Sequence, residues 1–483
     1  MSASFEPPES QPVPKSGGVL SVLVGRGSLY TIATAAPIAV SLAVTPVLTR
    51  VLGAHEYGIV GIAITLLQLG SMLLAFGLPL AITRSAIVEA AGAPGASALV
   101  LVGAGVAIVA GAAIAASTLF WVPSIFEAAG GVTGLMPPVI SAIGLAMVSL
   151  AQALLRALER AGAFVIAAAA ASLAPPVLGL AMLGIFGPHA LVYLWALASG
   201  HLVIGAATVL VVTASVRPRW SDVRLRAAFR TALPTIPHQL ASPLLMTGLV
   251  GAATVLYGAA AAGQVQLALL LGTAPMFVLS SLNHAWSPLI MRTPDDQRVR
   301  VSRDSAVLVA ALTLVMSAGF VALIGPMSRL IAGPVLATPD FVSAASTAAI
   351  GASFMVVYLA NIQLVFRHGR TGLLGITSPT STIISISVAA ALGSTFGGDL
   401  RFIVGGVTLN WVLMSLVSLW LRSRTDEPPV QLGPAIPYLA GSVALTATWA
   451  FVPVPAWVGW VLLAMTLLLV GAVQLGAVRR RRR

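Results

Sequence analysis

The sequence predicts an all-α polytopic membrane protein of about fourteen transmembrane helices, arranged as two six-helix lobes and two further C-terminal helices. Three observations predict this class. Of the 483 residues, 58% are hydrophobic and only 8% are charged, whereas a soluble domain carries about 25% charged residues. Apolar stretches of membrane-spanning length recur along the whole chain, and the basic residues gather in alternate connections between them.

Each spanning helix needs about 20 mostly apolar residues, and fourteen stretches meet that requirement. Short breaks divide them, such as the Gly187–Pro188 step and the turn at Pro453–Pro455. In chain order the stretches are residues 29–52, 57–82, 97–121, 134–155, 163–186, 189–213, 234–257, 262–290, 305–325, 343–366, 372–395, 401–421, 434–452 and 456–477.

The positive charges predict an orientation. With the N-terminus inside, 23 of the 26 Lys and Arg residues fall in cytosolic segments, and only Arg50, Arg329 and Arg401 fall outside. One missed span would move every later loop to the other side, so we expect an even number of helices and both termini inside. This asymmetry explains the net charge of +12 without nucleic acid as a partner, and it places the basic run 479–483 beside anionic lipid.

Several classes of function are disfavoured. The chain has no Cys, so disulfides and thiolate metal sites are absent. It has no GxxxxGK[ST] phosphate loop, and its longest connection, residues 214–233, is too short for a catalytic domain. The acidic pairs Asp295–Asp296 and Asp426–Glu427 lie in basic loops and are interpreted as solvated charges. We therefore expect no enzymatic activity, no cofactor and no metal.

An internal repeat predicts the domain organisation. Gly53 and Gly58 bracket the first interhelical connection, and Gly258 and Gly263 bracket a matching one at the same offset of 205 residues. Parallel repeats of this kind build transporters whose central pathway opens to each side in turn. The expected domains are a disordered cytosolic tail (1–27), an N-lobe (28–213), a cytosolic amphipathic linker (214–233), a C-lobe (234–424) and the last two helices with a basic tail (425–483).

The stretch LTRVLGAHEYGIVG, with a second helix that ends in FGLPLAITR, resembles the opening of the Wzx-type polysaccharide flippases of the multidrug/oligosaccharidyl-lipid/polysaccharide exporter superfamily. The segment LRAAFRTALP, residues 225–234, is similar to the basic linker of that family. The resemblance implies a flippase that moves polyprenyl-diphosphate-linked oligosaccharide from the cytosolic to the outer leaflet by alternating access. It also implies membrane lipids, a polysaccharide polymerase and glycosyltransferases as partners, and a bacterial cytoplasmic membrane as the location.

Other functions stay open at this point. They are a peptidoglycan lipid-precursor flippase, a cation-coupled multidrug exporter and a non-transporting membrane component of glycan assembly. Acidic residues well inside the spans, on which cation-coupled exporters of the superfamily rely, are missing here. This absence favours an anionic or neutral polar substrate.

Three arginines are candidates for contact with such a substrate. Arg50 lies at the outer end of the first helix, and its planar fork could hold phosphate or sugar hydroxyls; snorkelling to headgroups or pairing with Glu56 are the alternatives. Arg84 and Arg292 occupy matching places in the two lobes at the cytosolic mouth. They could bracket the diphosphate, or simply anchor the helices as positive-inside residues.

Polar residues within the spans are the second group of candidates, because they usually face the bundle interior or a cavity. Helix–helix hydrogen bonds are the alternative. The two histidines could also titrate near neutral pH, which leaves proton coupling open. The candidates are His238 and Gln239 beside Pro234 and Pro237, Asn283 and His284 in the eighth stretch, and Asn361 and Gln363 in the tenth.

Overall fold

In the computed structural model, the described residues are 26–87, 89, 91–125, 131–220, 225–233, 236–367, 373–425 and 430–482, and every regular element in them is a helix. The predicted tail therefore lies almost wholly outside the described residues. The helices are α2 (Arg26–Leu74), α3 (Leu78–Ile87), α4 (Gly92–Ile125), α5 (Gly131–Ala157), α6 (Ala161–Phe186), α7 (Ala190–Ser215), α8 (Leu225–Ala232), α9 (Ile236–Tyr257), α10 (Ala259–Gly272), α11 (Ala274–Arg292), α12 (Asp295–Ile331), α13 (Gly333–Leu336), α14 (Pro339–Ala349), α15 (Gly351–Arg367), α16 (Leu374–Thr395), α17 (Leu400–Val404), α18 (Gly406–Arg422), the 3₁₀ turn η3 (Gly433–Ala435), α19 (Ile436–Phe451) and α20 (Ala456–Arg482).

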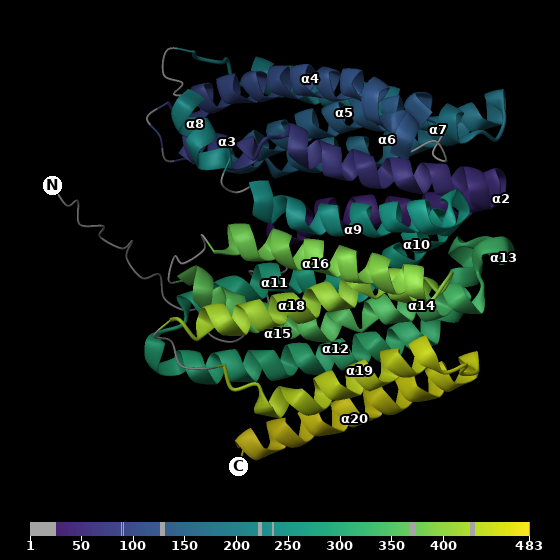
Figure 1. The fold of residues 1–483 in the computed structure, drawn as a ribbon. Helices are drawn as coiled ribbons and strands as arrows, with labels where there is room; N and C mark the ends of the chain where they lie inside the picture. Colours follow the sequence, from purple (N-terminus) through teal and green to yellow (C-terminus); the bar gives the residue numbers. More distant parts are fainter. Residues whose placement is uncertain are drawn as a thin grey trace.

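The helices form two groups that lie side by side (Figure 1). We call α2–α7 the first lobe and α9–α18 the second lobe; α8 connects them, and α19 and α20 pack on α12. Most helices run roughly along one direction of the molecule. We name its two ends after nearby residues. The Gly53 end contains α13, at the right of Figure 1, whose Gly333 lies next to Thr49 and Arg50. The Arg84 end contains α8 and α3, which carries Arg84 in its last turn, at the left of Figure 1.

Gly53 breaks α2 into two helical segments. Its φ of 73° and ψ of 179° lie in a region of backbone conformation that is essentially restricted to glycine. Gly258, at the predicted repeat position, has a φ of 85° and a ψ of 179° and precedes α10. The two connections thus share one backbone geometry. Gly58 and Gly263, which we also predicted as hinge residues, lie in regular helix.

Each of the fourteen predicted stretches coincides with one or two helices. By length and composition, ten described segments could cross a membrane, or eleven if the bent pair α10–α11 is one span. The number of candidate spans is smaller than the fourteen predicted stretches for two reasons. The two stretches joined at Gly53 count as one helix, and α19 has only 16 residues. Helix α20 has 27 residues, of which only Ala456–Ala472 are described with their side chains. The all-α polytopic fold is confirmed; the number of crossings and the orientation stay predictions.

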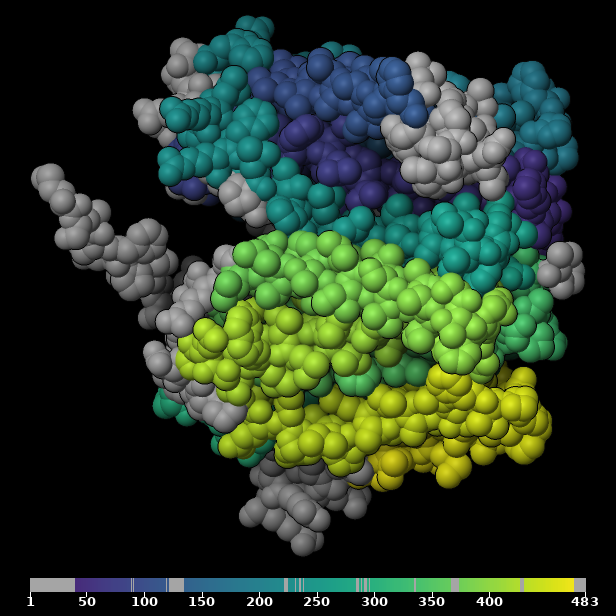
Figure 2. Space-filling model, in the orientation of Figure 1, coloured from purple at the N-terminus to yellow at the C-terminus, as the bar shows by residue number. Residues whose placement is uncertain are grey.

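The buried cores show where the lobes join. One hydrophobic cluster contains residues from both lobes, including Leu48, Tyr57 and Leu194 of the first lobe near the Gly53 end. A second cluster lies at the Arg84 end and draws only on α2–α8. Among the described residues, the lobes therefore share a core at the Gly53 end and not at the Arg84 end. Figure 2 shows the corresponding notch at the left edge of the molecule, between the teal atoms near α8 and the green atoms of α16.

Helix α8 lies against α3 at the Arg84 end. It buries Ala228 and Ala232 and exposes Arg226 and Arg230. This division into an apolar and a basic face is the pattern of a helix lying in the membrane interface. Residues 221–224 of the predicted linker lie outside the described part of the chain.

Candidate functional site

The contact between the lobes is made chiefly by α2, which packs against α9, α10, α12 and α13. Glycines allow the closest approach. A Cβ atom on Gly58 would lie 1.9 Å from the carbonyl oxygen of Ala259, and one on Gly263 would lie 3.0 Å from the Cα atom of Gly58. The two repeat-related glycines therefore meet backbone to backbone across the interface, as small residues do where membrane helices pack tightly.

Hydrogen bonds join the lobes at the same interface. Thr247 Oγ1 of α9 donates to the carbonyl oxygen of Thr65 in α2, at 3.0 Å. Thr49 Oγ1 donates to Ile331 O at 2.9 Å. Arg50 Nη2 donates to Leu330 O at 2.9 Å, and its Nη1 donates to Pro46 O within its own helix at 2.6 Å. The Gly53 end is thus closed by packing and by hydrogen bonds.

Glu56 has a different partner from the one that the sequence suggested. It accepts a hydrogen bond from the backbone N–H of Ala190, the first residue of α7, at 2.6 Å. A carboxylate at this place satisfies one of the unpaired N–H groups of the helix and opposes the positive end of its dipole. Glu56 therefore holds α2 to α7 within the first lobe, and Arg50 is bonded elsewhere.

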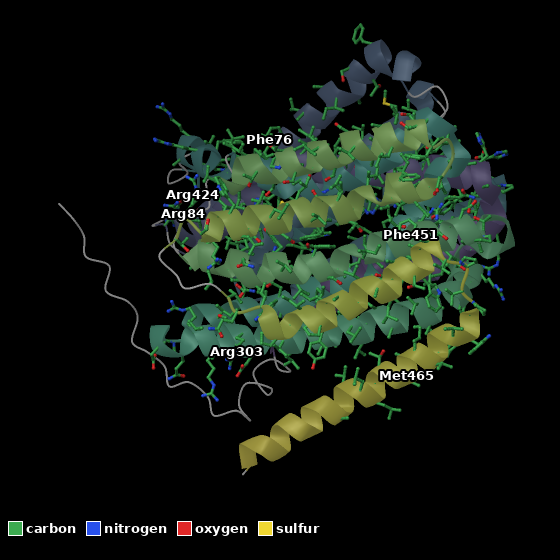
Figure 3. All side chains as sticks on the ribbon, turned by 60° about the horizontal axis from the view of Figure 1, so that its bottom comes forward. Phe76, Arg84, Arg303, Arg424, Phe451 and Met465 are labelled. Carbon is green, nitrogen blue, oxygen red and sulfur yellow. The ribbon has the colours of Figure 1, made fainter. Side chains whose placement is uncertain are left out.

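The Arg84 end carries most of the described arginines, and Figure 3 shows Arg84 and Arg424 at that end, with Arg303 at the same end on a more distant helix. Arg84 is exposed and lies 3.6 Å from the carboxylate of Glu89. The side chain of Arg292, its predicted counterpart, lies outside the described residues. The arginines of the Arg84 end whose side chains are described are Arg84, Arg156, Arg160, Arg217, Arg219, Arg226, Arg230, Arg298, Arg300, Arg303, Arg422 and Arg424.

Two of the predicted polar residues are brought together inside the second lobe. Gln363 of α15 is 1% exposed, and its Nε2 donates to Asn283 Oδ1 of α11 at 2.7 Å. Asn361 is equally buried and donates to Val357 O, one turn back in its own helix, at 2.8 Å. In this arrangement the three side chains bond helix to helix or to their own helix, while contact with substrate stays a prediction.

The remaining candidates lie on α9 and α11. Gln239 is exposed near the start of α9. The side chains of His238 and His284 lie outside the described residues, so their predicted part in proton coupling is untested. No group of three His, Cys, Asp or Glu side chains that could hold a metal occurs among the described residues.

Sequence reasoning missed Thr49 and Thr247, which in the described part of the chain bond across the lobes. A threonine in a membrane helix usually donates to a carbonyl of its own preceding turn, so composition gives no signal for an interlobe role. The position of Thr49 beside Arg50, just before the Gly53 break, was the signal that was present.

In the described part of the chain, two helical bundles share a core at one end and carry most of the arginines at the opposite end. The chain is a polytopic, all-helical membrane protein. Solved structures confirm the fold. The lipid II flippase MurJ in an inward closed conformation matches with a TM-score of 0.68 and 12% identity, over 93% of this chain and 99% of that one. An inward-facing MATE family transporter of the MOP superfamily matches at 0.63 and 16% identity, over 85% and 98%. The eukaryotic MATE transporter AtDTX14 matches at 0.64 and 13%, over 89% and 98%.

Residues 24–293 match the family described as polysaccharide biosynthesis protein. This match covers more than half of the chain, and the chain belongs to that family. No curated protein matches the sequence. This match confirms the predicted resemblance to a polysaccharide family, and the structure adds the closed Gly53 end.

Proposed function

We propose that this protein is a flippase for lipid-linked oligosaccharide in the assembly of a cell-surface polysaccharide. The match of residues 24–293 to the polysaccharide biosynthesis family carries the proposal, and the transporter fold supports it. The proposed substrate is a polyprenyl-diphosphate oligosaccharide. Its polar head opposes passage through lipid, because each unsatisfied polar group costs several kcal/mol in hydrocarbon. The protein makes and breaks no covalent bond.

The arrangement of the lobes supports alternating access as the mechanism. The Gly53 end is closed in this structure, and the described residues form no shared core at the Arg84 end. With the predicted orientation, the Arg84 end faces the cytosol, where its arginines would attract the diphosphate. Separation of α2 from α9 and α10 would then open the Gly53 end to the outer leaflet. The proposed location is the bacterial cytoplasmic membrane, with a polymerase acting on the exported product.

The test is flipping in liposomes that carry a fluorescent polyprenyl-diphosphate oligosaccharide in one leaflet. The matched control is a double variant, Gly61→Cys with Gln266→Cys. A Cβ on Gly61 would lie 3.2 Å from Gln266 Cβ, close to the 3.5–4.5 Å usual for a disulfide. We expect the oxidised double variant to be inactive and reduction to restore flipping. Rates equal to empty liposomes would refute the proposal, and flipping of lipid II alone would favour a peptidoglycan-precursor flippase.

A further inference from the structure

The last turn of α12 presents backbone acceptors to the first lobe. The last four carbonyl groups of a helix have no partner within it, and the C-terminal end of the helix dipole is negative. At the end of α12 the chain turns through Gly333, whose φ is +73°. The carbonyls of Leu330 and Ile331 bond to Arg50 and Thr49 of the opposite lobe. The positive guanidinium therefore opposes the negative end of a 37-residue helix.

We infer that Thr49 and Arg50 form a latch on the carbonyls of Leu330 and Ile331, which stabilises the state closed at the Gly53 end and must release before that end can open. Two adjacent side chains of one lobe bond to two adjacent carbonyls of the other. Any movement that separates α2 from the end of α12 breaks both bonds together. Their loss exposes acceptors that water and headgroups can then satisfy.

The surroundings support a latch rather than a permanent joint. Thr49 is buried while Arg50 is exposed, so one bond is shielded and the other is open to competition from water. The second nitrogen of Arg50 is fixed by Pro46 O of its own helix. The guanidinium is thus held in position before it meets α12, which lowers the entropy lost on closing. The Gly53 break, three residues further along, allows the two segments of α2 to change their angle.

The inference rests on the proposed alternating access. The experiment tests the latch separately from the proposed flippase function, because it needs no substrate. Gln266→Cys places a single thiol at the interface in a chain that has no other Cys. The rate at which a membrane-impermeant maleimide labels this thiol in proteoliposomes reports how often the Gly53 end opens. Arg50→Ala and Thr49→Val are added singly to this background.

The matched control is Arg329→Ala. Arg329 is an exposed arginine on the last turn of the same helix, and it makes no hydrogen bond to α2 in the described structure. Loss of a partly exposed hydrogen bond to a charged group changes a two-state ratio by about fivefold to tenfold. We expect Arg50→Ala to raise the labelling rate by about that factor, Arg50→Lys by less, and Arg329→Ala not at all.

A second measurement guards against simple unfolding. Oxidative cross-linking between Gly61→Cys and Gln266→Cys should slow when Arg50→Ala is added, while elution as a single folded species in detergent is retained. Labelling and cross-linking equal to those of Arg329→Ala would overturn the latch. Faster labelling without any flipping in the substrate assay would uphold the latch and count against the proposed function. Lost flipping with unchanged labelling would instead assign Arg50 to substrate binding.

Discussion

Substitution of Gly58 by alanine tests the closed interface most directly. The added methyl carbon would lie 1.9 Å from the backbone oxygen of Ala259, whereas such atoms need a separation of about 3.2 Å or more, since optimal contacts lie near 3.5 Å. No rotamer change relieves this clash, because both partners are close to the backbone. The segments must move apart by about 1 Å, and overpacking of this kind typically costs about 1–3 kcal/mol.

The expected result is a selective loss of the closed state. A cost of about 1.4 kcal/mol changes an equilibrium tenfold, so labelling of Gln266→Cys should rise by about tenfold in the Gly58→Ala background. The control is Gly251→Ala in α9, where an added Cβ would meet nothing within 4 Å. Labelling rates and thermal midpoints that are the same in both variants would refute the backbone-to-backbone contact between α2 and α10.

Three further predictions concern Gly53, Glu56 and Asp399, each of which lies at or beside the end of a helical segment. Gly53→Ala should lower the free energy of unfolding by about 1–3 kcal/mol, measured by thermal unfolding in detergent, because its φ and ψ are strained for alanine although no atom lies near; a neutral effect would contradict the break at this residue. Glu56→Gln keeps the shape of the side chain but removes the charge at the start of α7, and it should lower the free energy of unfolding by about 0.5–1 kcal/mol. Unchanged stability would argue against the hydrogen bond from Ala190 N. Arg401 beside Asp399 holds the pKa of that carboxyl below its ordinary value. A lowered pKa in the folded state stabilises the protein above the ordinary pKa, and this contribution is lost as the pH falls through the folded value. The stability difference between the wild-type protein and Asp399→Asn should therefore be constant near neutral pH and shrink in acid. A difference that grows in acid would mean that folding raises the pKa of Asp399 instead of lowering it.

The gathering of basic residues at one end of the bundle was predictable, because charges between apolar stretches can be read directly from the sequence. Arg84, Arg303 and Arg424 flank apolar stretches in the sequence, and all three lie at one end of the bundle (Figure 3). The repeated glycines were equally visible, and Gly53 and Gly258 share their backbone conformation. Gly58 and Gly263 were not predictable in the same way, since a glycine in a helix can serve either for bending or for close packing.

The sequence by itself determined that lipid surrounds the chain, that the chain is helical, that the backbone breaks at Gly53 and that most arginines gather at one end. These features were predictable because hydropathy, charge and glycine conformation act over a few residues. Only the tertiary structure decided the partners of the polar side chains. Arg50 bonds to a carbonyl 280 positions away and Gln363 to an amide 80 positions away. In a membrane, a buried polar group must find some partner, but which one it finds depends on how the helices pack, and no local pattern encodes that choice.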